Sequence, residues 1–141
     1  MHSVDSAKLL EALDRHAADA GRTLRALVQV NVSGERSKSG LAPEAVPEAL
    51  SLANRLRNVQ VCGLMTIPPL AEDPETARPF FRKLRERRED WAAEFGIDLP
   101  ELSMGMTHDL EVAIEEGATF VRVGTGIFGA RAKPAGEAEA T

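Results

Sequence analysis

Hydrophobic positions change between helical and strand spacing several times along the chain, and this pattern predicts five strands separated by helices. Val4 marks a very short first strand. The amphipathic helix after it runs to about residue 20, where Asp5 or Ser6 can cap its start and Gly21 can end it. The remaining elements follow in chain order: a strand at 24–32, a helix at about 43–57, a strand at 59–67, a helix at about 74–95, a strand at 99–106, a helix at about 107–116, a strand at 119–123 and a helical turn around Ile127 and Phe128.

The order of these elements indicates the fold class. Strands that alternate with helices imply an α/β protein with a parallel sheet, and the nearly continuous apolar run at 59–67 is typical of a strand covered on both faces. Such a sheet is either open and doubly wound or closed as a (β/α) barrel. Because five strands cannot close the usual eight-stranded barrel, the pattern leaves both arrangements open.

Composition places these elements in one globular domain. The chain has 141 residues, of which 43% are hydrophobic and 28% charged, and this is long enough to bury a core. From Ala132 onward no bulky apolar residue occurs, so we expect a domain at 1–131 and a mobile tail at 132–141.

Charge, cysteine content and the lack of long apolar stretches argue against several classes of partner and of protein. The net charge of −5 argues against binding to nucleic acid or to an anionic membrane, and the basic run from Arg82 to Arg88 is interpreted as the solvated face of a helix. The single cysteine, Cys62, excludes an internal disulfide framework, and we expect both Cys62 and Met65 to be core residues. No apolar stretch is long enough to span a membrane and no secretory signal opens the sequence, so we expect the cytoplasm.

Small and hydroxylated residues, among them Thr66, collect where the predicted strands end, which is where parallel α/β folds bind ligands. The turns "SMGMT" at 103–107 and "GTGIFG" at 124–129 have the composition of a phosphate site, because glycine lets backbone N–H groups approach an anion and hydroxyls add donors. Glycines that serve only tight turns are the alternative interpretation. The same strand ends show no His/Cys cluster at metal spacing and no pair of carboxylates suited to acid and base roles.

Arg122 lies between Val121 and Val123, so strand alternation turns its side chain to the face opposite theirs. A guanidinium is costly to desolvate without an acceptor. The acceptor is either a group on a neighbouring strand or an atom of a ligand, unless the side chain is simply exposed near the end of the strand. The residues alone leave these possibilities open.

Three further polar residues are candidates for chemistry. His108 and Asp109 directly follow the first glycine turn, and we interpret them as residues of a first helical turn rather than as a catalytic pair. Lys38 is the only lysine of four that falls in a loop after a strand, where it can meet an anionic ligand or remain solvated.

Five segments in the same order as in a known family carry a resemblance: "HSVDS" at 2–6, "VQVNVSGERSKSG" at 28–40, "GLMTIP" at 63–68, "LSMGMTHDLEVAIEEGAT" at 102–119 and "VRVGTGIFGAR" at 121–131. Together they resemble the YggS family, the pyridoxal phosphate homeostasis proteins. The resemblance covers about residues 2–131.

The resemblance implies a barrel of the alanine racemase N-terminal kind, fold type III among proteins that bind pyridoxal 5′-phosphate (PLP). Members of the family hold and deliver PLP without a defined catalytic turnover, so it implies a PLP-binding protein of vitamin B6 and amino-acid homeostasis rather than an enzyme. Arg122 would face the pyridine nitrogen. The implied phosphate ligands are Ser103, Gly105, Thr107, Gly124 and Thr125.

Two departures from the family pattern matter. Thr107 stands where the family usually has serine, which keeps the hydroxyl. The family's chain normally begins well before Met1, and its Schiff-base lysine lies on the first strand, in that earlier part. The resemblance therefore implies a truncated barrel that carries strands four to eight, with self-association or a second chain supplying the missing strands. PLP would then be held weakly and reversibly, unless Lys38 substitutes for the absent lysine.

Two other functions are alternatives to this interpretation. A PLP-dependent racemase-like protein or a phosphate-binding barrel enzyme such as an aldolase would need a catalytic base or a Schiff-base lysine at a strand end. A ligand-free interaction fragment would need neither, and missing strands would favour it.

Overall fold

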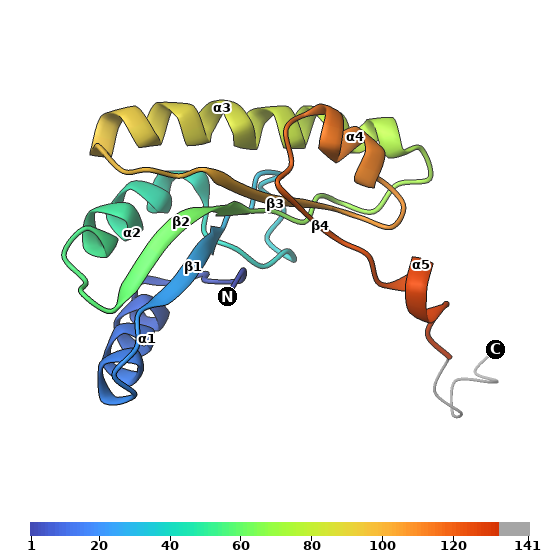
Figure 1. The fold of residues 1–141 in the computed structure, drawn as a ribbon. Coiled ribbons are helices and arrows are strands. Elements are labelled where there is room, and N and C mark those ends of the chain that lie inside the picture. Colours follow the sequence, from blue (N-terminus) through green and yellow to red (C-terminus); the bar gives the residue numbers. More distant parts are fainter. Residues whose placement is uncertain (133–141) are drawn as a thin grey trace.

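The computed structural model describes residues 1–132, which form one parallel sheet of four strands with helices packed on it (Figure 1). The strands lie side by side in chain order: β1 (Leu24–Gln29), β2 (Val59–Met65), β3 (Glu101–Met106) and β4 (Phe120–Arg122). A doubly wound sheet would reverse this order at a switch point and carry helices on both faces. Consecutive order is the arrangement of a barrel.

The helices between the strands begin and end for local reasons. Their bounds are α1 (Ala7–Asp19), α2 (Val46–Ala53), α3 (Arg78–Phe95), α4 (Leu110–Glu115) and α5 (Thr125–Phe128). The Ser6 hydroxyl caps α1 by accepting from the Leu9 N–H at 3.1 Å, and Gly96 ends α3 in the left-handed conformation. The predicted helices at 43–57 and 74–95 both open with a 3₁₀ turn, at Pro43–Ala45 and Pro74–Ala77, and the former ends four residues early at Ala53.

The structure corrects the prediction of a first strand at Val4. Val4 forms only an isolated bridge to Val28: its N–H donates to the Leu27 carbonyl at 3.2 Å, and its own carbonyl accepts from the Gln29 N–H at 2.7 Å. This bridge adds a single parallel pair to β1, in addition to the pairing of β1 with β2. The described part of the chain therefore holds four strands, with an isolated bridge at Val4 in place of the predicted fifth strand.

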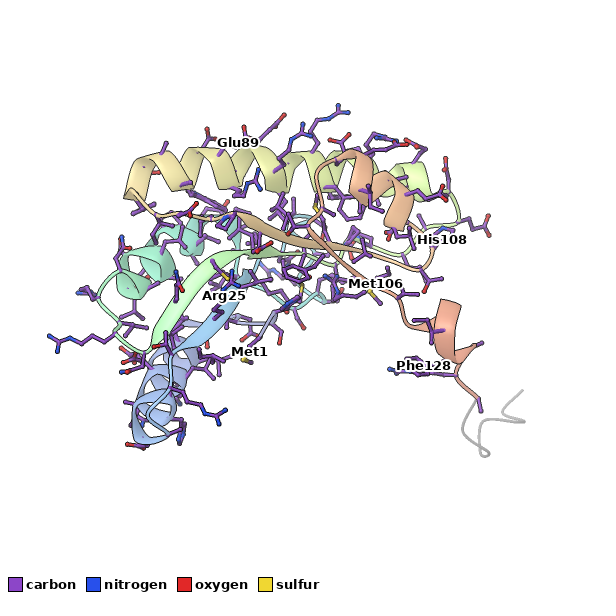
Figure 2. The ribbon with its side chains drawn as sticks, viewed as in Figure 1. Met1, Arg25, Glu89, Met106, His108 and Phe128 are labelled. Carbon is purple, nitrogen blue, oxygen red and sulfur yellow. The ribbon has the colours of Figure 1, made fainter. Side chains whose placement is uncertain are left out.

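One apolar cluster shows that α1 to α4 cover the same face of the sheet. Its members include Leu10 of α1, Leu50 of α2, Phe81 of α3, Ala113 of α4 and alternate residues of the strands. We call the opposite face the inner face, and Met1, Arg25 and Met106 lie on that side, away from α3, in Figure 2. Consecutive strands with helices on one side make this fold a partial α/β barrel, as predicted.

The inner face carries a second, smaller apolar cluster of Leu27, Cys62 and Met65. The prediction that Cys62 and Met65 are core residues is confirmed, although they face away from the helices. Beside them, Gly63 permits β2 and β3 to pair, because a Cβ at this position would lie 2.0 Å from the Glu101 carbonyl oxygen.

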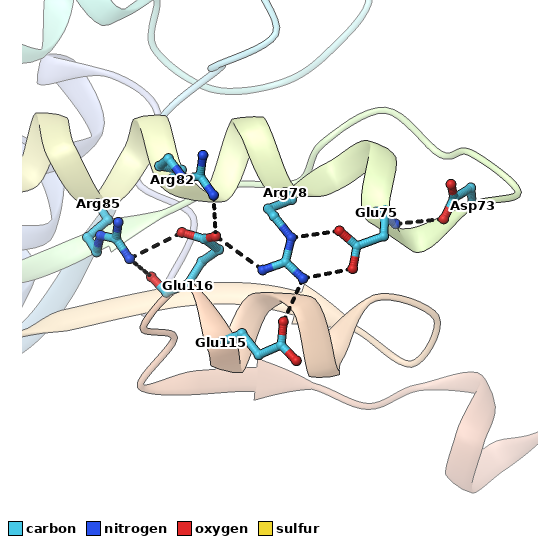
Figure 3. A network of polar contacts seen from close by, with 7 residues as sticks. All are labelled: Asp73, Glu75, Arg78, Arg82, Arg85, Glu115 and Glu116. Carbon is cyan, nitrogen blue, oxygen red and sulfur yellow. Dashed lines mark hydrogen bonds and ion pairs between the residues drawn. The ribbon is translucent and has the colours of Figure 1, made fainter.

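A network of ion pairs fastens α3 to α4 (Figure 3). The Glu116 side chain, only 6% exposed, accepts from Arg78 at 3.2 Å and lies 3.1 Å from both Arg82 and Arg85. Arg78 also pairs with Glu75 and Glu115. The run 82–88 is largely exposed, as predicted, and the Arg82 side chain is 53% exposed, but Arg82 and Arg85 also pair with this carboxylate.

Two further expectations concern the tail of the chain and membrane-spanning helices. The predicted tail at 132–141 lies outside them, apart from Ala132. Within residues 1–132, no helix combines the length and apolar character needed to cross a membrane.

Candidate functional site

Arg122, at the end of β4, reaches across the inner face and is held by two acceptors. Its Nη1 donates to the Ser103 hydroxyl on β3 at 2.6 Å, and its Nη2 donates to the Thr66 carbonyl, which follows β2, at 3.0 Å. The guanidinium is half-buried, and burial lowers the pKa of Arg122, but arginine remains a cation at neutral pH. Of the acceptors considered from sequence, the structure supplies one on the neighbouring strand β3, and a second comes from the loop after β2.

Ser103 is fully buried and joins Arg122 to His2. Its Oγ lies 2.9 Å from His2 Nδ1, and the His2 ring packs edge-on against Phe120 with 4.9 Å between the ring centroids. Burial, followed by the nearby N-terminal amino group and Arg122, lowers the pKa of His2 and favours its neutral form. No role in the site was predicted for His2, because its only signal in the sequence is its place in the segment "HSVDS".

Thr107 connects the turn after β3 to the start of α5. Its Oγ1 accepts from the Gly126 N–H at 3.1 Å. The Asp109 carboxylate accepts from the Met106 N–H at 2.7 Å and so shapes the same turn directly before α4. This agrees with the interpretation of Asp109 as a residue of the helix start.

A cavity of about 710 Å³ opens beside this connection. The turn after β3, the loop after β2 and the segment from Gly124 to Arg131 form its walls, and Lys38 also lines it. Of the six predicted site residues, Thr107, Gly124 and Thr125 line the cavity, whereas Ser103, Gly105 and Arg122 do not. The structure thus divides the predicted site into a cavity group and an inner-face group.

The two groups are neighbours, because Met106 and Arg122 are paired residues of β3 and β4. Gly105, between Ser103 and Thr107, has a φ of +96° and lies where a Cβ would be 2.6 Å from the Ala113 side chain of α4. Its glycine is needed for this close packing and for the backbone conformation.

Asn31 organises the loop that brings Lys38 to the cavity. The Asn31 amide donates to the Glu35 carbonyl at 2.8 Å and to the Lys38 carbonyl at 3.4 Å, and its oxygen accepts from the Gly34 N–H at 3.2 Å. Sequence reasoning missed this role. The signal in the sequence is Asn31 followed closely by Ser33 and Gly34, a combination that favours such turns.

The polar groups of the site are hydroxyls, backbone amides, cations and the carboxylates of Asp73 and Asp109, and apolar side chains form much of the cavity wall. Within the described range 1–132, no three His, Cys, Asp or Glu side chains are grouped to hold a metal ion. The hydroxyl, amide and ammonium donors suit a phosphate, and the neighbouring guanidinium suits a hydrogen-bond acceptor.

Comparisons with known proteins place this geometry in a family. The model of the alanine racemase N-terminal domain family matches residues 1–132. The pyridoxal phosphate homeostasis protein of Aquifex aeolicus is 50% identical over 131 residues, which are 93% of this chain and 58% of that protein. The protein of the same name from Pseudomonas aeruginosa is 44% identical over 131 residues, 93% of this chain and 55% of the relative.

A solved structure extends the likeness to three dimensions. The structure of PipY from Synechococcus elongatus with PLP bound matches with a TM-score of 0.82 at 36% identity, over 91% of this chain and 59% of that one. The chain spans a little over half the length of the relatives it matches. By its sequence and its fold, the chain belongs to the alanine racemase N-terminal domain family.

Proposed function

We propose that this chain binds PLP and takes part in PLP homeostasis without a catalytic turnover of its own. The observation that carries the proposal is the connection between the two halves of the site. Arg122 pairs with Met106, the residue before Thr107, and its side chain reaches back along β3 to Ser103. The Thr107–Gly126 hydrogen bond follows directly after this pair, so hydrogen-bond donors suited to a phosphate lie next to the Arg122 guanidinium.

The cavity group fits the phosphate. The Thr107 hydroxyl accepts one hydrogen bond and keeps its own hydrogen to donate. The first N–H groups of α5, at Thr125 and just before it at Gly124, have no acceptor within the helix, and open space surrounds Gly124. Lys38 adds a positive charge to the same cavity. We therefore propose Thr107, Gly124 and Thr125 as phosphate ligands.

Arg122 fits the ring nitrogen. Its guanidinium has five N–H donors, and Ser103 and Thr66 occupy only two of them. Since arginine stays protonated, it donates to the nitrogen and keeps that atom unprotonated. When bound, PLP supplies an electron-withdrawing ring, and the ring withdraws less strongly in this state. This favours binding and carriage of PLP over catalysis.

We also propose that further strands complete the barrel, from a second copy or from another chain. β4 is the last strand of the sheet in the described part of the chain, and two of its three residues, Phe120 and Val121, are exposed at 41% and 37%. An open strand edge with apolar side chains favours pairing with another strand.

An enzymatic or covalent role would depend on Lys38, the lysine that lines the cavity. The test is a titration of the 141-residue chain with PLP, followed by absorbance, borohydride reduction and peptide mass analysis. We expect saturable binding that is reversed by dialysis and no stable label on Lys38 after reduction. Lys83→Arg, on α3, controls for nonspecific labelling, and Lys38→Arg removes the amine while keeping the charge.

Two results would contradict the proposal. Absence of saturable binding would refute PLP binding by this chain. Stoichiometric labelling of Lys38, lost in Lys38→Arg and kept in Lys83→Arg, would refute the noncovalent account and favour the enzymatic alternative.

A further inference from the structure

The geometry points to Ser103 and His2 as positioning residues that hold Arg122 for the pyridine ring, with Ser103 playing no part in phosphate binding. This inference rests on the proposed function, since it concerns the ring end of the same site. It also changes the role that the family resemblance implied for Ser103.

The position of Ser103 separates it from the phosphate donors. Its side chain is fully buried on the inner face, and it does not line the cavity that Thr107, Gly124 and Thr125 share. Its Oγ accepts from Arg122 at 2.6 Å, which leaves its own hydrogen for the acceptor 2.9 Å away, His2 Nδ1. Both hydrogen-bond partners of the Ser103 hydroxyl are therefore groups of the protein itself.

His2 completes the chain of hydrogen bonds when it is neutral. With the proton on Nε2, Nδ1 accepts from Ser103, and Ser103 in turn accepts from Arg122. A protonated His2 would have to donate to Ser103, so the Ser103 oxygen would accept from two cations and its own hydrogen would lose its acceptor. It would also add a second cation beside the guanidinium.

The charges around His2 come from the chain's N-terminus and from neighbouring strands, and on balance they favour the neutral form. The N-terminal amino group of Met1 and the guanidinium of Arg122 repel a protonated ring, whereas Glu101 of β3 attracts it. Glu101 is itself paired with Arg25 of β1 at 3.5 Å. The aligned arrangement is therefore present above the pKa of His2 and is lost as the pH falls through it.

The arrangement fixes a side chain that would otherwise have several rotamers. The Thr66 carbonyl holds one end of the guanidinium at 3.0 Å and Ser103 holds the other, so the plane of the group is set before a ligand arrives. Without Ser103, Arg122 would have to be ordered upon binding, and the affinity for the ring would fall.

The first test compares PLP with inorganic phosphate as ligands of the wild-type chain and three variants. We expect Ser103→Ala to weaken PLP binding about tenfold, the effect of one hydrogen bond to a charged group, and to leave phosphate binding unchanged. His2→Phe, which keeps the packing on Phe120, should weaken PLP binding in the same direction. His2→Asn, which keeps an acceptor near Nδ1, should restore most of the affinity.

A parallel loss of PLP and phosphate affinity in Ser103→Ala would overturn the inference, because it would make Ser103 a phosphate ligand. Unchanged PLP affinity in Ser103→Ala would also overturn it. If the wild-type chain binds no PLP at all, the proposed function fails and the positioning role fails with it.

A second test needs no ligand and separates the network from the proposed function. The His2 ring is titrated by NMR in the wild-type chain and in two variants. Ser103→Ala removes a donor to the neutral ring and Arg122→Gln removes a repelling cation, so both should raise the pKa of His2. A pKa that is the same in wild type and both variants would overturn the network, whatever the result with PLP.

Discussion

Replacement of Gly63 by alanine is expected to destabilise the chain by about 3 kcal/mol, the upper part of the usual range for overpacking. A Cβ at this position would lie 2.0 Å from the Glu101 carbonyl oxygen and 2.7 Å from the Glu101 Cβ. The obstacle is backbone, which cannot turn away as a flexible side chain would. The two central strands, β2 and β3, must separate to admit the methyl group, and their pairing at residues 63–65 is weakened.

The measurement is the free energy of unfolding from urea denaturation, with circular dichroism as the probe. Gly124→Ala is the matched control, because Gly124 has a negative φ and open space around it, so its unfolding free energy should stay within about 0.5 kcal/mol of wild type. Equal stability of Gly63→Ala and Gly124→Ala would show that β2 and β3 are not packed as described.

Replacement of Glu116 by glutamine is expected to cost about 2 kcal/mol of stability, below the range for a fully buried pair because its arginine partners are partly exposed. The carboxylate is 6% exposed and is approached by three guanidinium groups of α3 (Figure 3). Glutamine keeps the shape and removes the charge. The loss would loosen α4 from α3 and, through α4, the turn that carries Thr107.

Glu115→Gln is the matched control, because Glu115 lies next to Glu116, is 63% exposed and, among residues 1–132, pairs only with Arg78. Its removal should leave the unfolding free energy close to that of wild type. Stability curves of the two variants that coincide would contradict the role given to Glu116.

The Glu116 carboxylate is also expected to make the stability of the protein depend on pH. Hydrogen bonding from Arg82, and then from Arg78, holds the pKa of Glu116 below its ordinary value of 4.5. A group with a depressed pKa in the folded state stabilises the protein above its unfolded pKa, and this contribution disappears as the pH falls through the folded pKa. The stability difference between wild type and Glu116→Gln should therefore be full above pH 4.5 and should shrink under more acid conditions.

The strand and helix pattern was sufficient to predict most of the fold, because hydrophobic spacing directly reflects which face of each element is buried. It could not distinguish a doubly wound sheet from a barrel, since both place strands and helices in the same order. Spatial strand order and the single helix-covered face made that distinction. Val4 was predicted to form a strand from its apolar character, but one paired residue does not make a strand.

The candidate site was predictable in composition but not in arrangement. Period-two alternation correctly turned Arg122 away from Val121. The same rule fails in "SMGMT", because the positive φ of Gly105 and a register shift between Ser103 and Met106 break the alternation along β3. As a result, two hydroxyls that look equivalent in sequence, those of Ser103 and Thr107, lie in different surroundings.

Contacts between residues far apart in the chain were beyond the reach of local patterns. Ser103 and His2 are separated by 101 residues, and Arg122 and Thr66 by 56, so no spacing signal connects them. The ion pairs of the basic run on α3 were not predicted for the same reason. Its carboxylate partner, Glu116, lies beyond β3 in the sequence.

The central claim is that the turn after β3 and the start of α5 hold the phosphate of PLP, next to Arg122. Its most direct test is a comparison of amide chemical shifts in the ¹⁵N-labelled chain with PLP and with pyridoxal, which lacks the phosphate. PLP should shift the amides of Thr107, Gly124, Thr125 and Gly126, and pyridoxal at the same concentration should leave them nearly unchanged. Shifts of these four amides that are the same for both ligands, or the absence of any PLP-induced shift in these two turns, would contradict the account.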